Sequence, residues 1–392
     1  MVPAYDPFSA EAMTDPYPVY RELRRSAPVY RLEQYDTWAL SRFADVWEVL
    51  EDRERFSIVE GPVFSRERLL TPNGGPPPPA DGPLTSFSMI DPPRHTRYRQ
   101  ALRRSFTPRR ADTAGGVLAA LVSDQLDRVG AVDRFDVVED YAGPVSTAST
   151  LWFLGLPQGD GPWLRQRATD SVRRAPGQPG ITAAGAAARD EVHAYLLDHV
   201  QRAPGTVADD LLALGVPPDA VAVQLGTVLV GGIETLPKIL AGAVVRLAAA
   251  PEQLAVLRED PTVLAGAFEE IVRLDGVLQF VGRTLLTDTV IAGQPMTAGQ
   301  RVMLLLQSAN RDEREFVDPE RFDVRRVIPR HVGFGYGTHF CIGIHAARTT
   351  GVALLRGFLD RFPAFEVDLD GGERPPSEFQ IGWTRMPVVV GR

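Results

Sequence analysis

The stretch Phe-Gly-Tyr-Gly-Thr-His-Phe-Cys-Ile-Gly, residues 334–343, decides how the rest of the chain is interpreted. It contains Cys341, the only cysteine among 392 residues, and three glycines surround that cysteine. Glycine lets the backbone adopt unusual angles or approach another group closely. The apolar residues 344–355 that follow have the pattern of a helix. We therefore expect Cys341 on a tight loop at the N-terminus of a helix.

That position favours a thiolate, because the free N–H groups and the dipole at a helix N-terminus stabilise negative charge. From the residues alone, Cys341 is a metal ligand, a nucleophile or an inert buried thiol. Zinc is a further possibility, since His331, His339 and His345 lie close by in the sequence. A structural zinc site usually draws on two separated ligand pairs, and the chain has no second cysteine. Zinc is therefore the weaker interpretation.

The spacing Phe-Gly-x-Gly-x-His-x-Cys-x-Gly resembles the heme-ligand loop of the cytochrome P-450 superfamily, and other segments from about residue 15 onward agree with it. The resemblance implies a mainly α fold with a small β portion, in which a triangular helical domain encloses heme b. It implies a bacterial, soluble heme-thiolate monooxygenase with Cys341 as the axial ligand of the heme iron. We expect one domain over residues 1–392, extended up to about residue 14.

Composition limits the functions to be considered. Hydrophobic residues make up 44% of the chain and charged residues 23%, the balance of an ordinary globular protein. The net charge of −8 argues against nucleic acid as a main partner. One cysteine excludes internal disulfides and fits a reducing compartment. The sequence shows no signal peptide and no long uninterrupted apolar run, so we expect a cytoplasmic monomer that does not use a membrane.

Two residues suggest an anion-binding helix face. His95 and Arg99 follow an Asp-Pro-Pro helix start at residues 91–93 and are four residues apart, so they share one face. From the residues alone this face is either solvated or clamps an anion. It resembles the family's His-x-x-x-Arg pair, which holds a heme propionate. The resemblance also implies that Arg283 and His339 bind propionates.

Further arginines follow in the same region. They are Arg103, Arg104, Arg109 and Arg110, and on an acidic protein they form a plausible docking patch for an acidic electron donor. The chain has no flavin-binding or iron–sulfur motif of its own. The resemblance then implies electrons from a separate ferredoxin and ferredoxin reductase.

Residues 219–250 form a second focus, an apolar stretch that predicts one long buried helix. Its middle reads Gly-Gly-Ile-Glu-Thr-Leu-Pro at residues 231–237. Pro237 cannot donate a backbone hydrogen bond, so we expect a kink or bulge there that leaves a groove. Glu234 is costly in an apolar helix unless it is solvated or paired. By itself the pattern is that of a packing kink with an outward-facing glutamate.

The same stretch resembles the family's oxygen-activation motif, small-Gly-x-acid-Thr. That resemblance implies that Gly232 borders the groove for dioxygen, O2, and that Thr235 and Glu234 deliver protons to it. Leu236 and Pro237 depart from the usual family pattern. The departures concern the proton route and the shape of the bend.

Other residues are expected to support the heme. Glu270 and Arg273 are three apart on one helix face and can pair. The resemblance implies that Arg326 completes a buried network with them beneath the heme. It also implies that Phe334 shields the sulfur, while a backbone amide near Gly343 hydrogen-bonds to it.

The substrate region is the least specified by the sequence. Residues 61–88 include four successive prolines and are a loop, which the resemblance makes part of a lid. The expected pocket lining is Phe87, Leu225, Val228, Leu229, Leu278, Gln279, Phe280 and Ile381. This apolar set indicates a hydrophobic small-molecule or peptide substrate, oxidised by hydroxylation, epoxidation or oxidative coupling in secondary metabolite biosynthesis. Alternatives are a peroxide-driven peroxygenase and a non-catalytic heme-thiolate sensor or carrier.

Overall fold

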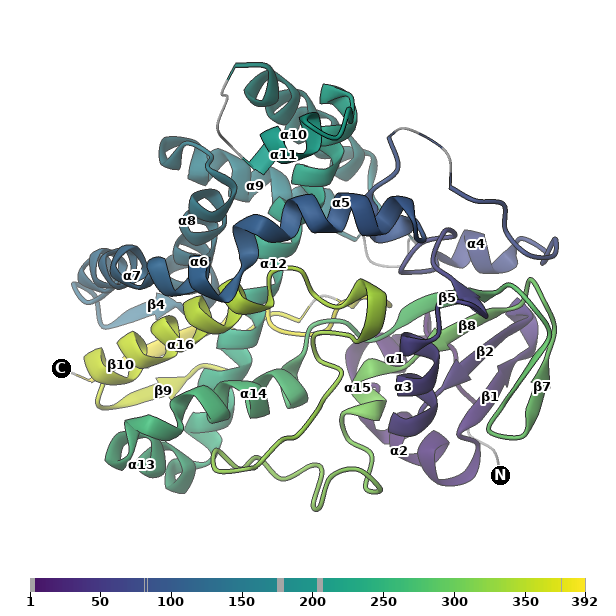
Figure 1. The fold of residues 1–392 in the computed structure, drawn as a ribbon. Coiled ribbons are helices and arrows are strands. Elements are labelled where there is room, and N and C mark those ends of the chain that lie inside the picture. Colours follow the sequence, from purple (N-terminus) through teal and green to yellow (C-terminus); the bar gives the residue numbers. More distant parts are fainter. Residues whose placement is uncertain are drawn as a thin grey trace.

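A computed structural model describes residues 4–80, 82, 84–174, 180–202, 207–374 and 376–391. Helices build the larger part of the molecule, and the main sheet lies at one side (Figure 1). The α-helices are α1 (Ala10–Thr14), α2 (Tyr17–Ser26), α3 (Phe43–Glu51), α4 (Arg66–Leu70), α5 (Arg94–Arg103), α6 (Pro108–Thr113), α7 (Gly115–Val129), α8 (Gly143–Leu154), α9 (Gly161–Val172), α10 (Ala183–Arg202), α11 (Val207–Leu212), α12 (Pro218–Ala249), α13 (Pro251–Glu259), α14 (Leu264–Asp275), α15 (Leu306–Ala309) and α16 (Ile344–Arg361).

Short helical turns connect some of these elements. They are η1 (Glu33–Tyr35), η2 (Phe87–Met89), η3 (Arg104–Phe106), η4 (Val137–Ala142), η5 (Gln158–Asp160), η6 (Pro261–Val263) and η7 (Gly337–His339). The turn η4 is a π-helix that runs directly into α8, and η7 lies within the cysteine loop.

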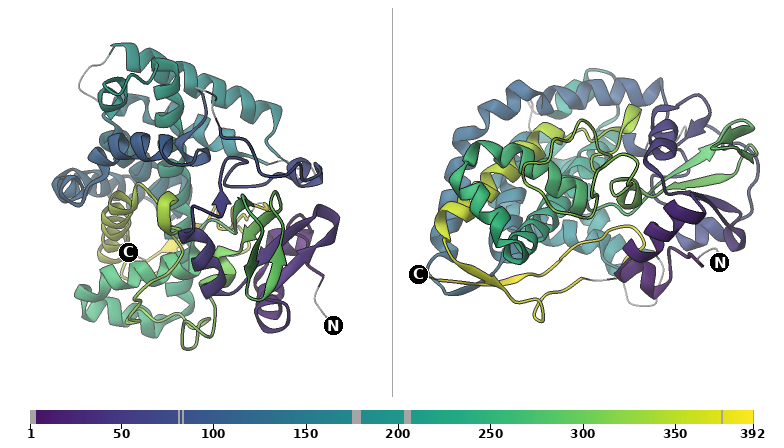
Figure 2. Two further views of the ribbon diagram at one scale, coloured as in Figure 1. Left: turned by 45° about the vertical axis from the view of Figure 1, so that its right-hand side comes forward. Right: turned by 90° about the horizontal axis from the view of Figure 1, so that it is seen from below.

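The strands form three small sheets. They are β1 (Val29–Leu32), β2 (Thr37–Leu40), β3 (Phe56–Ser57), β4 (Arg134–Asp136), β5 (Val281–Leu285), β6 (Thr289–Ile291), β7 (Gln294–Met296), β8 (Arg301–Leu304), β9 (Phe365–Val367) and β10 (Pro387–Val390). The largest sheet has the order β1-β2-β8-β5-β3, with β2 parallel to β8 and the other pairs antiparallel. It lies on the opposite side of the molecule from the sheet β4-β10-β9 (Figures 1 and 2).

Helix α12 passes through the centre of the helical part and carries its core (Figure 1). Its side chains belong to two large apolar clusters, one with α14 and α16 and one with α5, α8, α10 and α11. The helix is long and apolar enough to cross a membrane, but 72% of its most apolar 18-residue segment is buried inside the protein. Burial of most of its surface explains its composition, as expected for a core helix.

Most of the elements that we predicted from the sequence are confirmed, including the long apolar helix and the helix after Cys341. Three details differ. The N-terminal segment is not extended up to residue 14, because Ser9 caps α1 by accepting a hydrogen bond from the Ala12 amide at 3.1 Å. The loop at 61–88 contains α4 and η2, while residues 1–3, 81 and 83 lie outside the described residues. Helix α12 continues through Pro237 as an uninterrupted α-helix, without the bulge expected there.

Candidate active site

A cavity lies between the middle of α12 and the cysteine loop, residues 333–343. One face of α12 forms a wall, with Thr227, Val228, Gly231, Gly232, Thr235, Leu236 and Ile239 at helical spacing. The cysteine loop and the first turns of α16 form a second wall, and Arg99 of α5 and Arg283 of β5 also reach the cavity. Both sequence stretches singled out above therefore border the same space.

Cys341 is half-buried and lines this cavity. Its backbone N–H donates to the carbonyl oxygen of Phe334 at 2.9 Å, which closes the loop. The loop needs its glycines: Gly335 and Gly337 have φ values of 69° and 71°, and a Cβ on Gly337 would collide with the Leu50 carbonyl of α3. The sequence of the loop thus sets the position of the sulfur.

Two opposing effects act on the Cys341 thiol. Burial raises its pKa, while a hydrogen bond from the Gly343 amide and the positive charges of Arg99 and Arg348 lower it, and burial wins. The predicted amide donor at Gly343 is therefore present. The helix N-terminus by itself does not produce a thiolate here, so a bound metal ion would have to supply the missing stabilisation.

Four donor side chains, His95, Arg99, Arg283 and His339, gather beside the cysteine loop. The rings of His95 and His339 lie 4.1 Å apart between centroids, and the other two are arginines of α5 and β5 that line the cavity. His95 is 1% exposed, and within the described residues neither of its ring nitrogens has a hydrogen-bond partner.

The electrostatics of this group are unfavourable without an anion. Burial, followed by repulsion from Arg99, lowers the pKa of His95 to about 4. Burial, followed by repulsion from its cationic neighbours, lowers the pKa of His339 to about 2. Burial lowers the pKa of Arg283 to about 10. A buried cluster of cations and orphaned donors fits an anionic group such as paired carboxylates.

The α12 wall carries the predicted oxygen-side residues. Thr235 lines the cavity, and its hydroxyl donates to the Gly231 carbonyl at 2.8 Å. Gly232 lets α8 approach, since a Cβ there would collide with Thr150, and its carbonyl accepts from the Ser146 hydroxyl at 2.8 Å. Glu234 does not line the cavity. It is 8% exposed and forms an ion pair with Lys238 at 2.9 Å.

Comparisons with known proteins agree with this arrangement. A family model described as cytochrome P450 matches residues 215–390. The chain is 32% identical over 405 residues to cytochrome P450 130 from Mycobacterium tuberculosis, which covers 97% of this chain and 96% of that protein. The chain belongs to the cytochrome P450 family. It is also 32% identical over 412 residues to the vitamin D(3) 25-hydroxylase of Pseudonocardia autotrophica, covering 99% and 96%.

The fold agrees as well. The crystal structure of CalO2 superimposes on this P450 with a TM-score of 0.85 at 30% sequence identity, covering 99% of both chains. The predicted mainly α P450 fold is therefore confirmed, and so is the enzyme class, a monooxygenase that uses heme iron and O2.

The residues of this P450 fit a heme. Cys341 is placed to hold the iron, and His95, Arg99, Arg283 and His339 are the donors that two propionates would need. Phe334 lines the same cavity as Cys341, which fits the predicted shielding role, and the guanidinium of Arg348 lies 5.5 Å from its ring centroid. The bound heme would supply the oxidation chemistry, while the chain supplies its ligand and its charge balance.

The predicted substrate lining requires a correction against the lining of the whole cavity. Phe87, Val228 and Leu278 line it as predicted, but Leu225, Leu229, Gln279, Phe280 and Ile381 do not. Leu225 and Leu229 pack into the cluster with α10 and α11. Phe280 is buried in the N-terminal cluster, and Gln279 is hydrogen-bonded to the Tyr20 hydroxyl at 3.1 Å and to the Ser377 carbonyl at 2.6 Å. The residues that sequence reasoning missed include Ile58, Phe106, Phe153, Ile239, Val281 and Leu306.

The predicted support network of the P450 is present. Arg273 donates twice to the Glu270 carboxylate, at 2.6 and 2.8 Å, and Arg326 donates to it at 3.0 Å. Arg273 also donates to the Asn310 backbone carbonyl at 2.7 Å. The Asn310 side chain accepts from the Val332 amide at 2.8 Å, so the network reaches the residue before the cysteine loop.

A second support cluster was not predicted. Glu269, next to Glu270, accepts two hydrogen bonds from Arg348 of α16, both at 2.7 Å, and one contact from His331 at 3.0 Å. These partners lower the pKa of Glu269 to about 2, although burial opposes the shift. The Gly333 amide donates to Nδ1 of His331, so Nε2 carries the proton directed at Glu269. No spacing rule links residues 269, 331 and 348, and the sequence showed only two adjacent glutamates.

Proposed function

We propose that this P450 uses heme b, O2 and two electrons from a ferredoxin and its reductase to oxidise a hydrophobic small molecule or peptide. One observation carries the proposal: Cys341 and Thr235 line the same cavity, one on the cysteine loop and the other on α12. A thiolate ligand on one side of a heme favours O–O bond cleavage on the other, where a hydroxyl group can supply protons.

The chain's own residues have distinct tasks in this proposal. The cluster of His95, Arg99, Arg283 and His339 neutralises the two propionates. The Thr235 hydroxyl orients a proton donor in the cavity, and Glu234 serves as the acid behind it. Since Glu234 lies outside the cavity lining and is paired with Lys238, it reaches the cavity only by changing its contacts.

The substrate proposal rests on the lining. The predicted lining residues that do border the cavity are apolar, and so are most of the additional ones. A relative of similar length is named a hydroxylase of vitamin D(3), an apolar molecule. We propose hydroxylation, epoxidation or oxidative coupling of a hydrophobic natural product in secondary metabolism. The enzyme would act as a cytoplasmic monomer with one domain, without a nucleic-acid or membrane partner.

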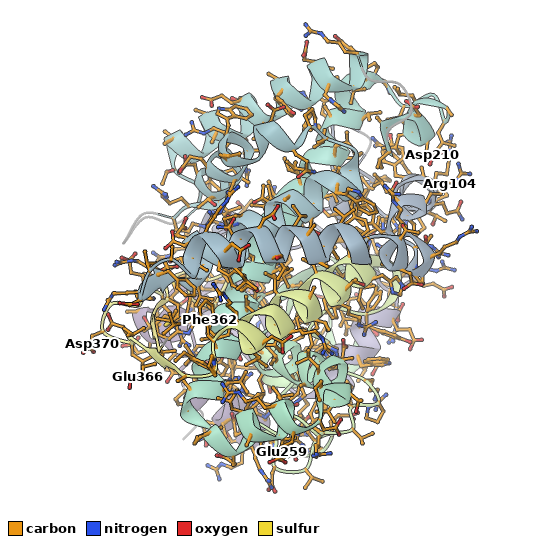
Figure 3. The ribbon with its side chains drawn as sticks, turned by 90° about the vertical axis from the view of Figure 1, so that its left-hand side faces the viewer. Arg104, Asp210, Glu259, Phe362, Glu366 and Asp370 are labelled. Carbon is orange, nitrogen blue, oxygen red and sulfur yellow. The ribbon has the colours of Figure 1, made fainter. Side chains whose placement is uncertain are left out.

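The electron donor would dock on the face of α5 and α16. Arg103 is exposed there, and its charge contributes to lowering the pKa of Arg99 and of His345, so it lies close to the thiolate side. Two other predicted patch residues have contacts of their own. Arg104 forms an ion pair with Asp210, which lies beside it in Figure 3, and Arg110 lies over the Trp152 ring at 3.8 Å. Arg103 and Arg109 are exposed, and Arg103 is the one whose charge reaches Arg99 and His345.

The test compares three conditions on one apolar substrate that shifts the heme spectrum. We expect product with a surrogate ferredoxin, its reductase and NADPH. Product with hydrogen peroxide alone at an equal or greater rate would favour a peroxygenase. No product under either condition, despite substrate binding, would favour a heme-thiolate sensor or carrier.

A further inference from the structure

Lys238 is the only lysine in the chain, although lysine and arginine together number 42. It lies on α12 one turn after Glu234, and it is 7% exposed. Lysine is rarely buried, and a buried ammonium is costly unless it is paired and hydrogen-bonded. A single lysine at such a position therefore needs an explanation from its contacts.

Three elements meet at this ion pair. The Lys238 ammonium donates to the Glu234 carboxylate at 2.9 Å and to the Gln380 side chain at 2.7 Å, which belongs to the segment before β10. The other carboxylate oxygen of Glu234 accepts from the Thr169 hydroxyl of α9 at 2.5 Å. Both oxygens are thus occupied, and the carboxylate is held away from the cavity that Thr235 lines.

The surrounding charges show which group controls Glu234. From α9, Arg165 acts on it at longer range, but Arg165 is bonded to Glu139 of η4 at 2.8 Å. Glu139 and Glu234 repel each other. Burial raises the pKa of Glu234, and Lys238 followed by Thr169 lowers it further than burial raises it. The ionised carboxylate therefore depends on Lys238.

The choice of lysine also has a physical consequence. The ion pairs of the described residues otherwise use arginine or histidine as the cation. Arginine holds a carboxylate with a planar fork of two bonds, whereas lysine makes a single contact with a flexible ammonium. A lysine lets the carboxylate rotate away more easily than an arginine fork would.

We propose that Lys238 is a positioning residue: together with Thr169 it keeps Glu234 ionised and holds its carboxylate outside the cavity. The carboxylate then rotates toward the cavity to take up a proton and pass it on. The functional part of this inference rests on the proposed role of Glu234 in proton delivery. The structural part, that Lys238 and Thr169 hold an ionised Glu234 carboxylate, does not depend on that role. The structural and the functional parts can therefore fail separately.

The first experiment uses the fact that one lysine gives one signal. The heme-loaded enzyme is labelled with ¹⁵N-lysine and studied as its diamagnetic ferrous–carbonyl form. We expect a side-chain signal protected from hydrogen exchange, which shifts in Glu234→Gln. A rapidly exchanging signal that is unaffected by Glu234→Gln would overturn the proposal, whether or not the enzyme turns over.

The second experiment removes the ammonium with Lys238→Met, which fills the same buried space. We expect an infrared band of a protonated carboxyl group at neutral pH that disappears in the Lys238→Met/Glu234→Gln double variant. Product formed per NADPH should become pH-dependent by about threefold or more, since the acid now titrates in the working range. A missing carboxyl band would overturn the positioning role. A carboxyl band with unchanged, pH-independent coupling would overturn the link to proton delivery.

Two further variants keep the test interpretable. Arg246→Met breaks the Arg246–Asp275 ion pair on the same helix without touching the cavity, and it should leave both the lysine signal and the coupling unchanged. If Lys238→Met does not fold, Lys238→Arg retains the charge but replaces the single contact with a fork. We then expect an ionised Glu234 and a fall of about threefold or more in product per NADPH. Wild-type coupling in Lys238→Arg would overturn the proposal.

Discussion

The cysteine loop shows how single residues prepare this chain for a heme. Cys341 is presented by a turn that tolerates only glycine at residue 337, and its sulfur receives a hydrogen bond from the Gly343 amide. Burial nevertheless keeps the pKa of the free thiol raised. The negative charge at this sulfur would therefore depend mainly on a bound iron, while the loop sets the position of the sulfur and adds one hydrogen bond.

Replacing the sulfur tests this assignment. We expect Cys341→Ser to lose the red-shifted Soret band of the ferrous–carbonyl complex, because that band requires a thiolate ligand. His345→Ala is the matched control, since His345 lies four residues later on α16 and does not line the cavity. An unchanged band in Cys341→Ser would show that another residue binds the iron.

The Thr235 hydroxyl gives the second prediction at this scale. Thr235→Ala should uncouple NADPH consumption from product by roughly tenfold or more, in line with the loss of a positioned proton-transfer group. Thr227→Ala is a close control, because Thr227 also lines the cavity and donates to the carbonyl four residues earlier, at 3.0 Å. Product and NADPH are measured together, and full coupling in Thr235→Ala would remove this hydroxyl from the proton route.

Residues joined by a local spacing rule could be predicted from the sequence, whereas those joined through space could not. The pair Glu270 and Arg273 follows from helical spacing, and the family motif added Arg326. The ion pair of Glu234 with Lys238 obeys the same spacing, so the sequence already contained a partner for that buried acid. The predicted cavity lining is correct only in part: Leu225 and Leu229 lie on the face of α12 that packs with α10, and apolar residues on both faces of the helix look alike in the sequence.

At the scale of elements, α14 is the part that fastens the cysteine loop to the core. Adjacent residues on this helix bind different targets: Glu270 holds Arg273 and Arg326, and Glu269 holds Arg348 of α16 and His331. The loop is thus held from both of its ends, by the segment that precedes it and by the helix that follows it. A rigid frame of this kind is what fixes the direction of a metal ligand.

This frame predicts a pH dependence of stability. The folded protein lowers the pKa of Glu269 from 4.5 to about 2, so its contribution is present above the unfolded value and is lost as the pH falls through that window. The full shift corresponds to about 3 kcal/mol of unfolding free energy. Glu269→Gln should remove this part of the pH dependence, measured by urea unfolding of the heme-loaded enzyme from neutral to acidic pH.

A control variant distinguishes the effect of Glu269 on stability from the general loss of stability at acidic pH. Glu22→Gln removes a carboxylate that pairs with Arg25 at an exposed site of α2, and such pairs contribute little to stability. Its pH profile should match that of the unmodified enzyme. If Glu269→Gln and the unmodified enzyme lose stability in parallel between these pKa values, Glu269 does not fasten the loop.

The main helices could be predicted from the sequence because the patterns that indicate them are local. The helices α5, α14 and α16 and the long α12 all follow from apolar periodicity, helical spacing and proline positions. The absence of a bulge at Pro237 is different, because the packing of α12 in two apolar clusters outweighs the single missing hydrogen bond. Tertiary packing of this kind is not visible in a local pattern.

At the scale of the whole molecule, charge is distributed unevenly. The protein carries a net charge of −8, yet the end of α5, η3 and the start of α6 carry Arg103, Arg104, Arg109 and Arg110. Figure 1 shows these elements following one another along one side of the helical part. Ion pairing neutralises part of this positive charge, because Arg104 is paired with Asp210 of α11. In the proposed docking, the exposed Arg103 attracts an acidic partner close to the thiolate side.

Reversing that charge should slow electron delivery. We expect Arg103→Glu to lower the rate of heme reduction by a surrogate ferredoxin on the order of tenfold at low salt, because steering by complementary charge acts mainly on association. Raised ionic strength should shrink the difference, since salt screens exposed charges. Arg25→Glu on α2 has the same change in net charge at an exposed site far from α5 and α16 in Figure 1, and it should leave the rate unchanged. If Arg103→Glu is reduced as fast as the unmodified enzyme at low salt, the docking site lies away from Arg103. If both variants are slowed equally relative to the unmodified enzyme, the effect is one of net charge alone.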